Sequence, residues 1–197
     1  MPKRRRTQQE RREETQAAVL DSACDLFGKK GYANTSLEEI ALDCGVTTSP
    51  IYHYYKNKKL LFTAATEVLE LKLALAIREA VKSSDQPIIL TIWSTFIEIC
   101  ADAGFRQVVL IDAPNILGRE RWPQCSAFIE IRQLLLKYKP VSALTDTAAE
   151  TELITRMLMS ALAEAAIMIG ESGAPKKLGK QAFHLIHRLV QQDSTKP

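Results

Sequence analysis

Apolar residues recur with helical spacing through almost the whole chain, and this periodicity constrains the fold more than any other feature of the sequence. No alternation of apolar and polar residues typical of strands persists anywhere. Gly, Pro and Ser clusters interrupt the pattern at intervals typical of helical domains. With 197 residues, the chain can bury the core of one domain, or of a small module joined to a larger one. The sequence therefore predicts an all-α fold.

Start and stop residues divide this pattern into separate helices. Ser36 and Glu39 have the spacing of a capping box, Gly45 can end the helix that follows, and Pro50 fits the first turn of the next one. Longer helices are expected over 7–30 (starting at Thr7 or Glu10), 58–81, 88–103, 122–139, 147–169 and 176–192, with a short buried helix over 105–111 that ends around Pro114.

Two short helices flank the turn at Gly45, and their apolar residues have the spacing of a helix-turn-helix. In that motif the first helix packs across the second and presents it to the major groove of DNA. The exposed side chains of the second helix would reach phosphates and base edges: Thr47, Thr48, Ser49, Tyr52, His53 and Tyr54. The alternative is an ordinary αα-hairpin whose tyrosines anchor it to a core.

The basic excess of the chain is concentrated at the N-terminus. Residues 1–12 carry six positive side chains and one negative one, a net charge of +5, whereas the whole chain carries +3. We therefore expect a basic flexible arm over 1–12 that attracts DNA phosphates without reading sequence. A solvated, disordered start is the alternative for such a run.

The residues around Gly45 resemble the N-terminal domain of TetR-family transcriptional regulators over about 13–62. The resemblance is carried by Tyr-Ala-Asn-Thr-Ser-Leu-Glu-Glu-Ile-Ala at 32–41 and by Gly-Val-Thr-Thr-Ser-Pro-Ile-Tyr-His-Tyr-Tyr-Lys-Asn-Lys-Lys-Leu-Leu at 45–61. It implies a three-helix, homeodomain-like DNA-binding domain at 13–57, followed by a larger helical ligand-binding and dimerisation domain at 58–197. It also implies a repressor that a small molecule releases from a palindromic operator in double-stranded DNA.

The resemblance extends to single positions. Thr35, Tyr52, Tyr54 and Lys58 match phosphate-contacting sites of the family, and Thr47, Thr48, Pro50 and His53 match positions that face bases. Two positions depart from the family pattern. Ser49 stands where the family often has Gly beside the DNA, and Tyr54 stands where His is commonest.

The C-terminal half is expected to hold an effector cavity and a dimer interface. The stretch 105–122 resembles the sixth-to-seventh-helix region of one TetR subgroup. Apolar and aromatic side chains of this half are candidates for the cavity wall, with a solid core as the alternative: Trp93, Phe96, Cys100, Phe105, Leu110, Leu117, Trp122, Phe128 and Met157. The helices over 147–169 and 176–192 are apolar over more than one stripe, which predicts a homodimer through a four-helix interface.

Other functions find less support in the sequence. A protein that only coats DNA would use the basic arm and show no preferred site. An enzyme would need a phosphate-binding Gly loop, a nucleophile elbow or a catalytic carboxylate pair, and the chain shows none of these patterns. The four cysteines are widely separated, and His184 and His187 have no third ligand at matching spacing, so no metal or cofactor is expected. No apolar run approaches 18 residues and no signal sequence is evident, so we expect a cytoplasmic protein that does not enter the membrane.

Overall fold

The computed structural model describes residues 7–137 and 147–192, and within these ranges it contains helices and turns but no strand. The predicted all-α class is confirmed. The helices are α1 (Gln8–Lys30), α2 (Leu37–Asp43), α3 (Thr48–Tyr55), α4 (Lys58–Ser83), α5 (Ile88–Ile99), α6 (Ala103–Phe105), the π-helix η1 (Arg106–Asp112), α7 (Ala113–Ile116), the 3₁₀-helix η2 (Arg119–Gln124), α8 (Ser126–Lys137), α10 (Ala148–Glu171) and α11 (Pro175–Gln192).

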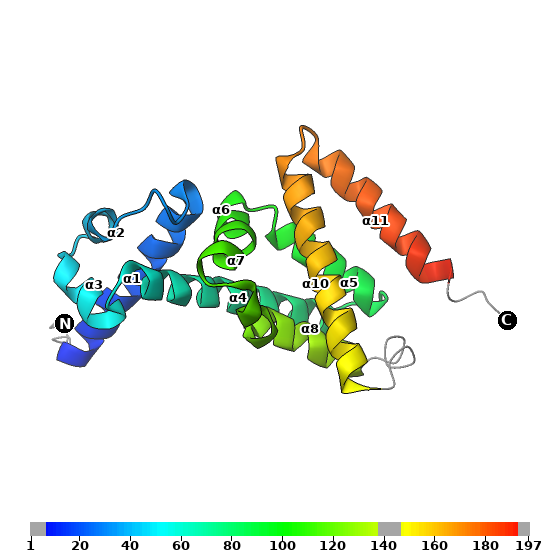
Figure 1. The fold of residues 1–197 in the computed structure, drawn as a ribbon, viewed down its shortest axis with the longest axis horizontal. Helices are drawn as coiled ribbons and strands as arrows, with labels where there is room; N and C mark the ends of the chain where they lie inside the picture. The colour runs from blue at the N-terminus through cyan, green and yellow to red at the C-terminus, as the bar shows by residue number, and fades with distance from the viewer. Residues whose placement is uncertain (1–6, 138–146, 193–197) are drawn as a thin grey trace, which may run out of the picture.

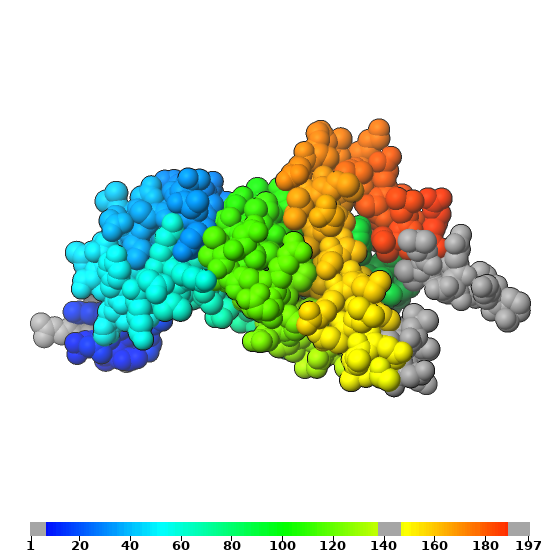
Figure 2. All heavy atoms as spheres, in the orientation of Figure 1, coloured from blue at the N-terminus to red at the C-terminus, as the bar shows by residue number. Residues whose placement is uncertain are grey.

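The molecule is elongated, with α1, α2 and α3 at one end and α10 and α11 at the other (Figure 1). The long α4 runs from the first group into the middle of the second, where it packs against α5 and α8. In the space-filling view the two groups meet without a gap on the visible face (Figure 2).

A single apolar core runs through both groups because α4 belongs to each of them. Near its start, Phe62 makes edge-to-face contacts with Phe27 and Tyr32, at ring-centroid distances of 5.1 and 4.9 Å. Further along, Leu73 and Ile77 are buried in the larger group. The two groups of helices are therefore joined by a rigid element.

Four expectations about helices differ from the structure. The helix expected over 88–103 ends at Ile99, and α6 begins at Ala103. Residues 8–12 fall both in the expected arm and in the helix expected over 7–30, and the structure places them in the first turns of α1, because Thr7 and Glu10 make a capping box. Pro114 does not end the buried helix, which continues as α7. Pro114 is the second residue of α7, so the N–H that it lacks belongs to the first turn of this helix. Trp122 lies in η2, and α8 begins only at Ser126. The remainder of the arm, 1–6, and the expected helix end at 138–140 lie outside the described residues.

Candidate nucleic-acid interface

The position of α2 is fixed by polar contacts at both of its ends. The predicted capping box is present: the Glu39 N–H donates to Ser36 Oγ at 3.1 Å, and the Ser36 N–H donates to the Glu39 carboxylate at 2.8 Å. Lys30 pairs with the same carboxylate at 2.9 Å, and these donors lower the pKa of Glu39. At the other end, Ser22 Oγ of α1 donates to Asp43 at 2.7 Å. Because both ends are tied, α2 cannot shift along α1.

The turn between α2 and α3 is a Schellman motif centred on Gly45. The Val46 N–H donates to Ala41 O at 2.9 Å, and the Gly45 N–H donates to Leu42 O at 3.2 Å. Gly45 has φ of +69°, a left-handed conformation that other residues adopt at a cost. This turn sets the angle at which α3 leaves α2.

One face of α3 packs inward and leaves the other face exposed. Ile51 is fully buried and Tyr55 nearly so, whereas Tyr52 is 49% exposed and His53 is exposed. Thr47 is the N-cap residue, but its hydroxyl makes no capping hydrogen bond. The third helical residue is Pro50, which lacks the N–H that such a hydroxyl usually accepts. The Thr47 side chain is therefore exposed without a role in capping.

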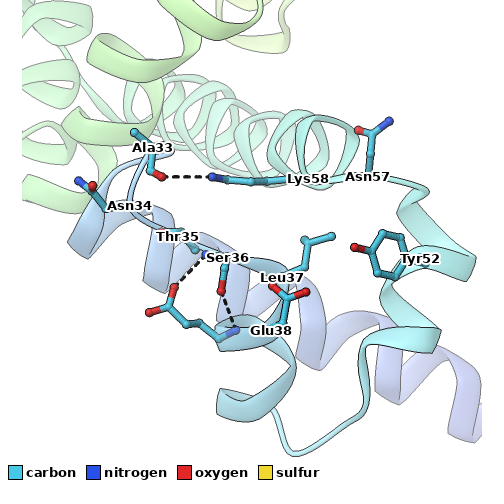
Figure 3. A pocket seen from close by; sticks show the side chains of 10 residues that line it. Ala33, Asn34, Thr35, Ser36, Leu37, Glu38, Tyr52, Asn57 and Lys58 are labelled. Carbon is cyan, nitrogen blue, oxygen red and sulfur yellow. Dashed lines mark hydrogen bonds between the residues drawn. The ribbon is translucent and has the colours of Figure 1, made fainter.

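An open cleft of about 480 Å³ lies where the loop before α2, the α3 side chains and the start of α4 come together (Figure 3). In Figure 3, Tyr52 points toward the cleft from α3, and Lys58 lies along its edge with Nζ directed at Ala33. Lys58 Nζ donates to Ala33 O at 3.4 Å and lies 4.3 Å from the centre of the Tyr32 ring. These contacts hold the ammonium group at the rim of the cleft.

Thr35 and Tyr54, which were expected to contact phosphates, are not fully exposed in the structure. Thr35 is only 2% exposed, and its hydroxyl lies 2.9 Å from Gly31 O and 3.2 Å from Leu26 O. It therefore braces the loop between α1 and α2. Tyr54 is half-buried, and its hydroxyl donates to Arg12 O at 3.4 Å. That contact directs the ring toward α1.

Sequence reasoning did not single out Asn34 and Asn57, which also line the cleft. Asn57 is the N-cap of α4, with its side-chain oxygen accepting from the Leu60 N–H at 2.9 Å. An Asn directly before the first residue of a helix is a strong N-cap signal that could have identified it. Nothing comparable in the sequence marks Asn34.

The helix-turn-helix group is joined to the larger group by a close backbone contact. Gly28 of α1 faces Gly104 of α6, and a Cβ on Gly28 would lie 2.9 Å from the Gly104 Cα atom. Beside this contact, the Tyr32 N–H donates to the Asp112 carboxylate at 2.7 Å. The end of α1 is therefore anchored to α6 and η1.

The structure gathers most of the candidate cavity residues into the core of the larger group. Trp93, Phe96, Cys100, Phe105, Leu110 and Phe128 are buried in one cluster, and Leu117 and Trp122 pack against it. Met157 does not join them. It is 63% exposed on α10, because its position on the helix is opposite to that of the buried residues Leu162 and Ala166. Met157 is therefore not part of a cavity wall within this chain.

Two buried carboxylates in this domain were not anticipated from the sequence. Glu70 of α4 is 2% exposed and forms a two-pronged ion pair with Arg121 of η2, with one N–O distance of 2.8 Å. Glu130 of α8 is paired with Arg78 of α4. Burial raises the pKa of Glu70, and Arg121 partly offsets this effect. These pairs hold η2 and α8 against α4.

The cysteines are free thiols in the structure. Burial raises the pKa of Cys24 and Cys125 to about 11 and that of Cys100 to about 12. Within 7–137 and 147–192, no group of three His, Cys, Asp or Glu residues is placed to hold a metal ion. Among the described helices, α10 is long and apolar enough to cross a membrane. Core helices of soluble proteins can have the same length and apolar composition.

Two family models match the chain. The model described as bacterial regulatory proteins of the tetR family matches residues 19–65. The model described as tetracyclin repressor-like, C-terminal domain, matches residues 89–192.

Curated relatives match only the N-terminal part. HTH-type transcriptional regulator AcrR of Shigella flexneri is 44% identical over 66 residues, which are 34% of this chain and 30% of that protein. HTH-type transcriptional regulator TtgR of Pseudomonas putida is 40% identical over 65 residues, which are 33% of this chain and 30% of that protein. The matched segment thus spans less than a third of the length of these relatives.

Solved structures match over nearly the full chain. A TetR-family transcriptional regulator from Pectobacterium atrosepticum aligns with a TM-score of 0.66 and 23% identity, over 98% of this chain and 100% of that one. FadR from Bacillus subtilis, in complex with stearoyl-CoA, aligns with a TM-score of 0.68 and 17% identity, over 86% and 96%. At these identities, the likeness shows the fold alone.

The helix-turn-helix geometry and the family models agree, and the C-terminal model alone covers more than half of the chain. The family consists of DNA-binding regulators and not of enzymes. This chain belongs to the TetR family of transcriptional regulators.

Proposed function

We propose that the protein is a repressor that binds a near-palindromic operator as a homodimer and is released when a small molecule binds its C-terminal domain. The observation that carries the DNA-binding part is the exposed face of α3. Ile51 and Tyr55 are buried and anchor the helix in the core. Thr47, Ser49 and His53 are exposed on the other side of the helix. A helix held in this way can enter the major groove with its N-terminal half.

Base reading is assigned to Thr47, Thr48, Pro50 and His53, with Ser49 beside the DNA. Phosphate contacts are assigned to Tyr52 and Lys58, which flank the open cleft. Thr35 and Tyr54 then support this surface from within, because their hydroxyl groups lie against backbone carbonyls. We place the protein in the cytoplasm, where its operator would be.

Footprinting on selected DNA tests this assignment. His53→Ala should change the preference at one base pair by about 1–3 kcal/mol, because only that contact is lost. Lys58→Ala should weaken binding similarly on all sequences and reduce the salt slope by about one unit. Binding of the intact protein without any preferred site would favour the alternative of a DNA-coating protein.

The homodimer is supported by the unpartnered apolar face of α10. Leu153, Met157 and Met168 are all more than half exposed and recur along one side of the helix. A second copy would cover this side together with α11, which accounts for the apolar character of α10 without a membrane. The FadR neighbour was solved in complex with stearoyl-CoA, which supports the idea that a protein of this fold holds a small-molecule ligand.

A further inference from the structure

A cavity of about 360 Å³ lies between the end of α5, the start of η1, α10 and the first turns of α11. Its apolar wall is formed by Ile97, Cys100, Ala166 and Ile169. The buried wall residues of α10 lie on the opposite side of that helix from Met157 and Met168. The cavity therefore belongs to one chain and is not the surface proposed for the dimer.

The charged groups of this cavity are mostly positive. Arg106, Lys176 and Lys180 line it, with Glu98 as the single acidic lining residue. The N-terminus of α11 adds positive potential, since Pro175 also lines the cavity and begins an 18-residue helix. An apolar wall with a cationic rim fits a molecule that has an apolar body and an anionic head.

Arg106 is held in place by the backbone around it. Its Nη1 donates to Cys100 O and, at 2.9 Å, to Ala101 O, at the end of α5. Its Nε and Nη2 lie against Gly170, where an added Cβ would come within 2.3 Å of Nε. Among the described residues, the hydrogen bonds of the Arg106 side chain all come from Nη1. The guanidinium thus presents free donors at the cavity.

Gly179 keeps the cavity open from the side of α11. A glycine within a helix is unfavourable relative to alanine, so its presence there needs a reason. A Cβ at this position would make only ordinary contact with Ile169, at 3.9 Å. A larger side chain would therefore extend into the cavity without disturbing the backbone.

We propose that this cavity binds a small amphiphilic carboxylate, with Arg106 and Lys180 holding the carboxylate and the wall of α5 and α10 holding the apolar part. The binding claim stands apart from the proposed repressor function. Only its consequence rests on that function: a ligand wedged between η1 and α10 would alter the contact of η1 with α1 and so the affinity for DNA.

Calorimetry on the full-length protein tests the binding claim with octanoate, octan-1-ol and acetate. Octanoate should bind, whereas octan-1-ol and acetate should each bind at least about tenfold more weakly. The alcohol lacks the carboxylate, and acetate lacks the apolar chain. Lys180→Gln should weaken octanoate binding roughly fivefold. The matched variant Lys177→Gln, on the same helix but outside the cavity, should not change it.

Gly179→Leu should abolish octanoate binding without lowering the melting temperature. Equal binding of octanol and octanoate, equal effects of the two lysine variants, or undiminished binding by Gly179→Leu would each overturn the proposal. DNA affinity is measured separately with and without octanoate. Octanoate binding that leaves DNA affinity unchanged would contradict its role in regulation but not the site.

Discussion

Gly45 shows how one backbone conformation determines the presentation of α3. Its φ of +69° is disfavoured for residues with a Cβ, and no atom lies within 4 Å of the place that a Cβ would take. Gly45→Ala should therefore lower the free energy of unfolding by about 1 kcal/mol through backbone strain alone. Urea denaturation measures this change. Gly173→Ala, also at an open position but without positive φ, should stay within about 0.5 kcal/mol of the wild type.

The buried ion pair of Glu70 and Arg121 should contribute strongly to stability. Arg121→Met leaves a buried carboxylate without its partner and should lower the free energy of unfolding by about 3–5 kcal/mol at pH 7. Arg156→Met removes an exposed pair with Glu152 and should cost at most about 0.5 kcal/mol.

The pH dependence of this loss has a definite sign. The pKa of Glu70 is already raised above its ordinary value of 4.5 by burial, and loss of Arg121 raises it further. When the pKa of a group is higher in the folded than in the unfolded protein, the group stabilises the fold most at pH values below its unfolded-state pKa. This stabilisation is lost as the pH rises through the folded-state pKa. The difference between Arg121→Met and wild type should therefore shrink as pH falls from 7 toward 4.5. An equal loss across that range would show that Glu70 is not the group responsible.

The sequence predicted residue roles well where local chemistry decides them. Ser36, Glu39 and Gly45 act as expected, since caps and turns depend on neighbours in the chain. Thr35 and Met157 did not follow expectation. The burial of Thr35 depends on how the loop folds back on α1, and the exposure of Met157 depends on which side of α10 faces the core. Both are properties of packing that spacing alone does not determine.

At the scale of elements, long helices were predictable and short irregular ones were not. The bounds of α1, α4, α10 and α11 agree with expectation to within about two residues, the usual uncertainty at helix ends. The π-helix η1 has the same apolar residues as an α-helix would, so periodicity could not distinguish the two. The cleft before α2 was likewise invisible, because it forms between segments distant in the sequence.

The contact of α1 with α6 gives a prediction about elements. Gly28→Ala places a methyl group 2.9 Å from the Gly104 backbone, so the two helices must separate. The free energy of unfolding should fall by about 1–3 kcal/mol, as in other overpacked sites. Gly179→Ala provides the matched control in another helix. It meets only Ile169 at 3.9 Å and should raise stability by about 0.5–1 kcal/mol through helix propensity. The same sign for both variants would contradict a packing role for Gly28.

The whole molecule combines a small end, which holds α1, α2 and α3, with a larger end (Figure 1). The larger end carries the exposed apolar face of α10. The two ends are joined by the continuous α4 and by the anchoring of α1 to η1. The two ends of the molecule are therefore physically connected through packed elements.

The proposed dimer should depend on the exposed apolar face of α10. Met157→Glu puts a charge in the middle of the exposed apolar face of α10, where a partner would have to bury it. We expect sedimentation equilibrium to change from twice the 22.0 kDa chain mass to the single mass. Because two linked recognition helices bind far more tightly than one, operator affinity should fall at least about a hundredfold.

Leu71→Glu is the matched control, because Leu71 is half exposed on α4, a helix outside the proposed four-helix interface. It should leave both mass and operator affinity unchanged. If Met157→Glu remained a dimer, the interface would have to use another face of the larger domain. If it became a monomer with full operator affinity, one recognition helix would suffice for binding, and the palindromic operator would lose its physical basis.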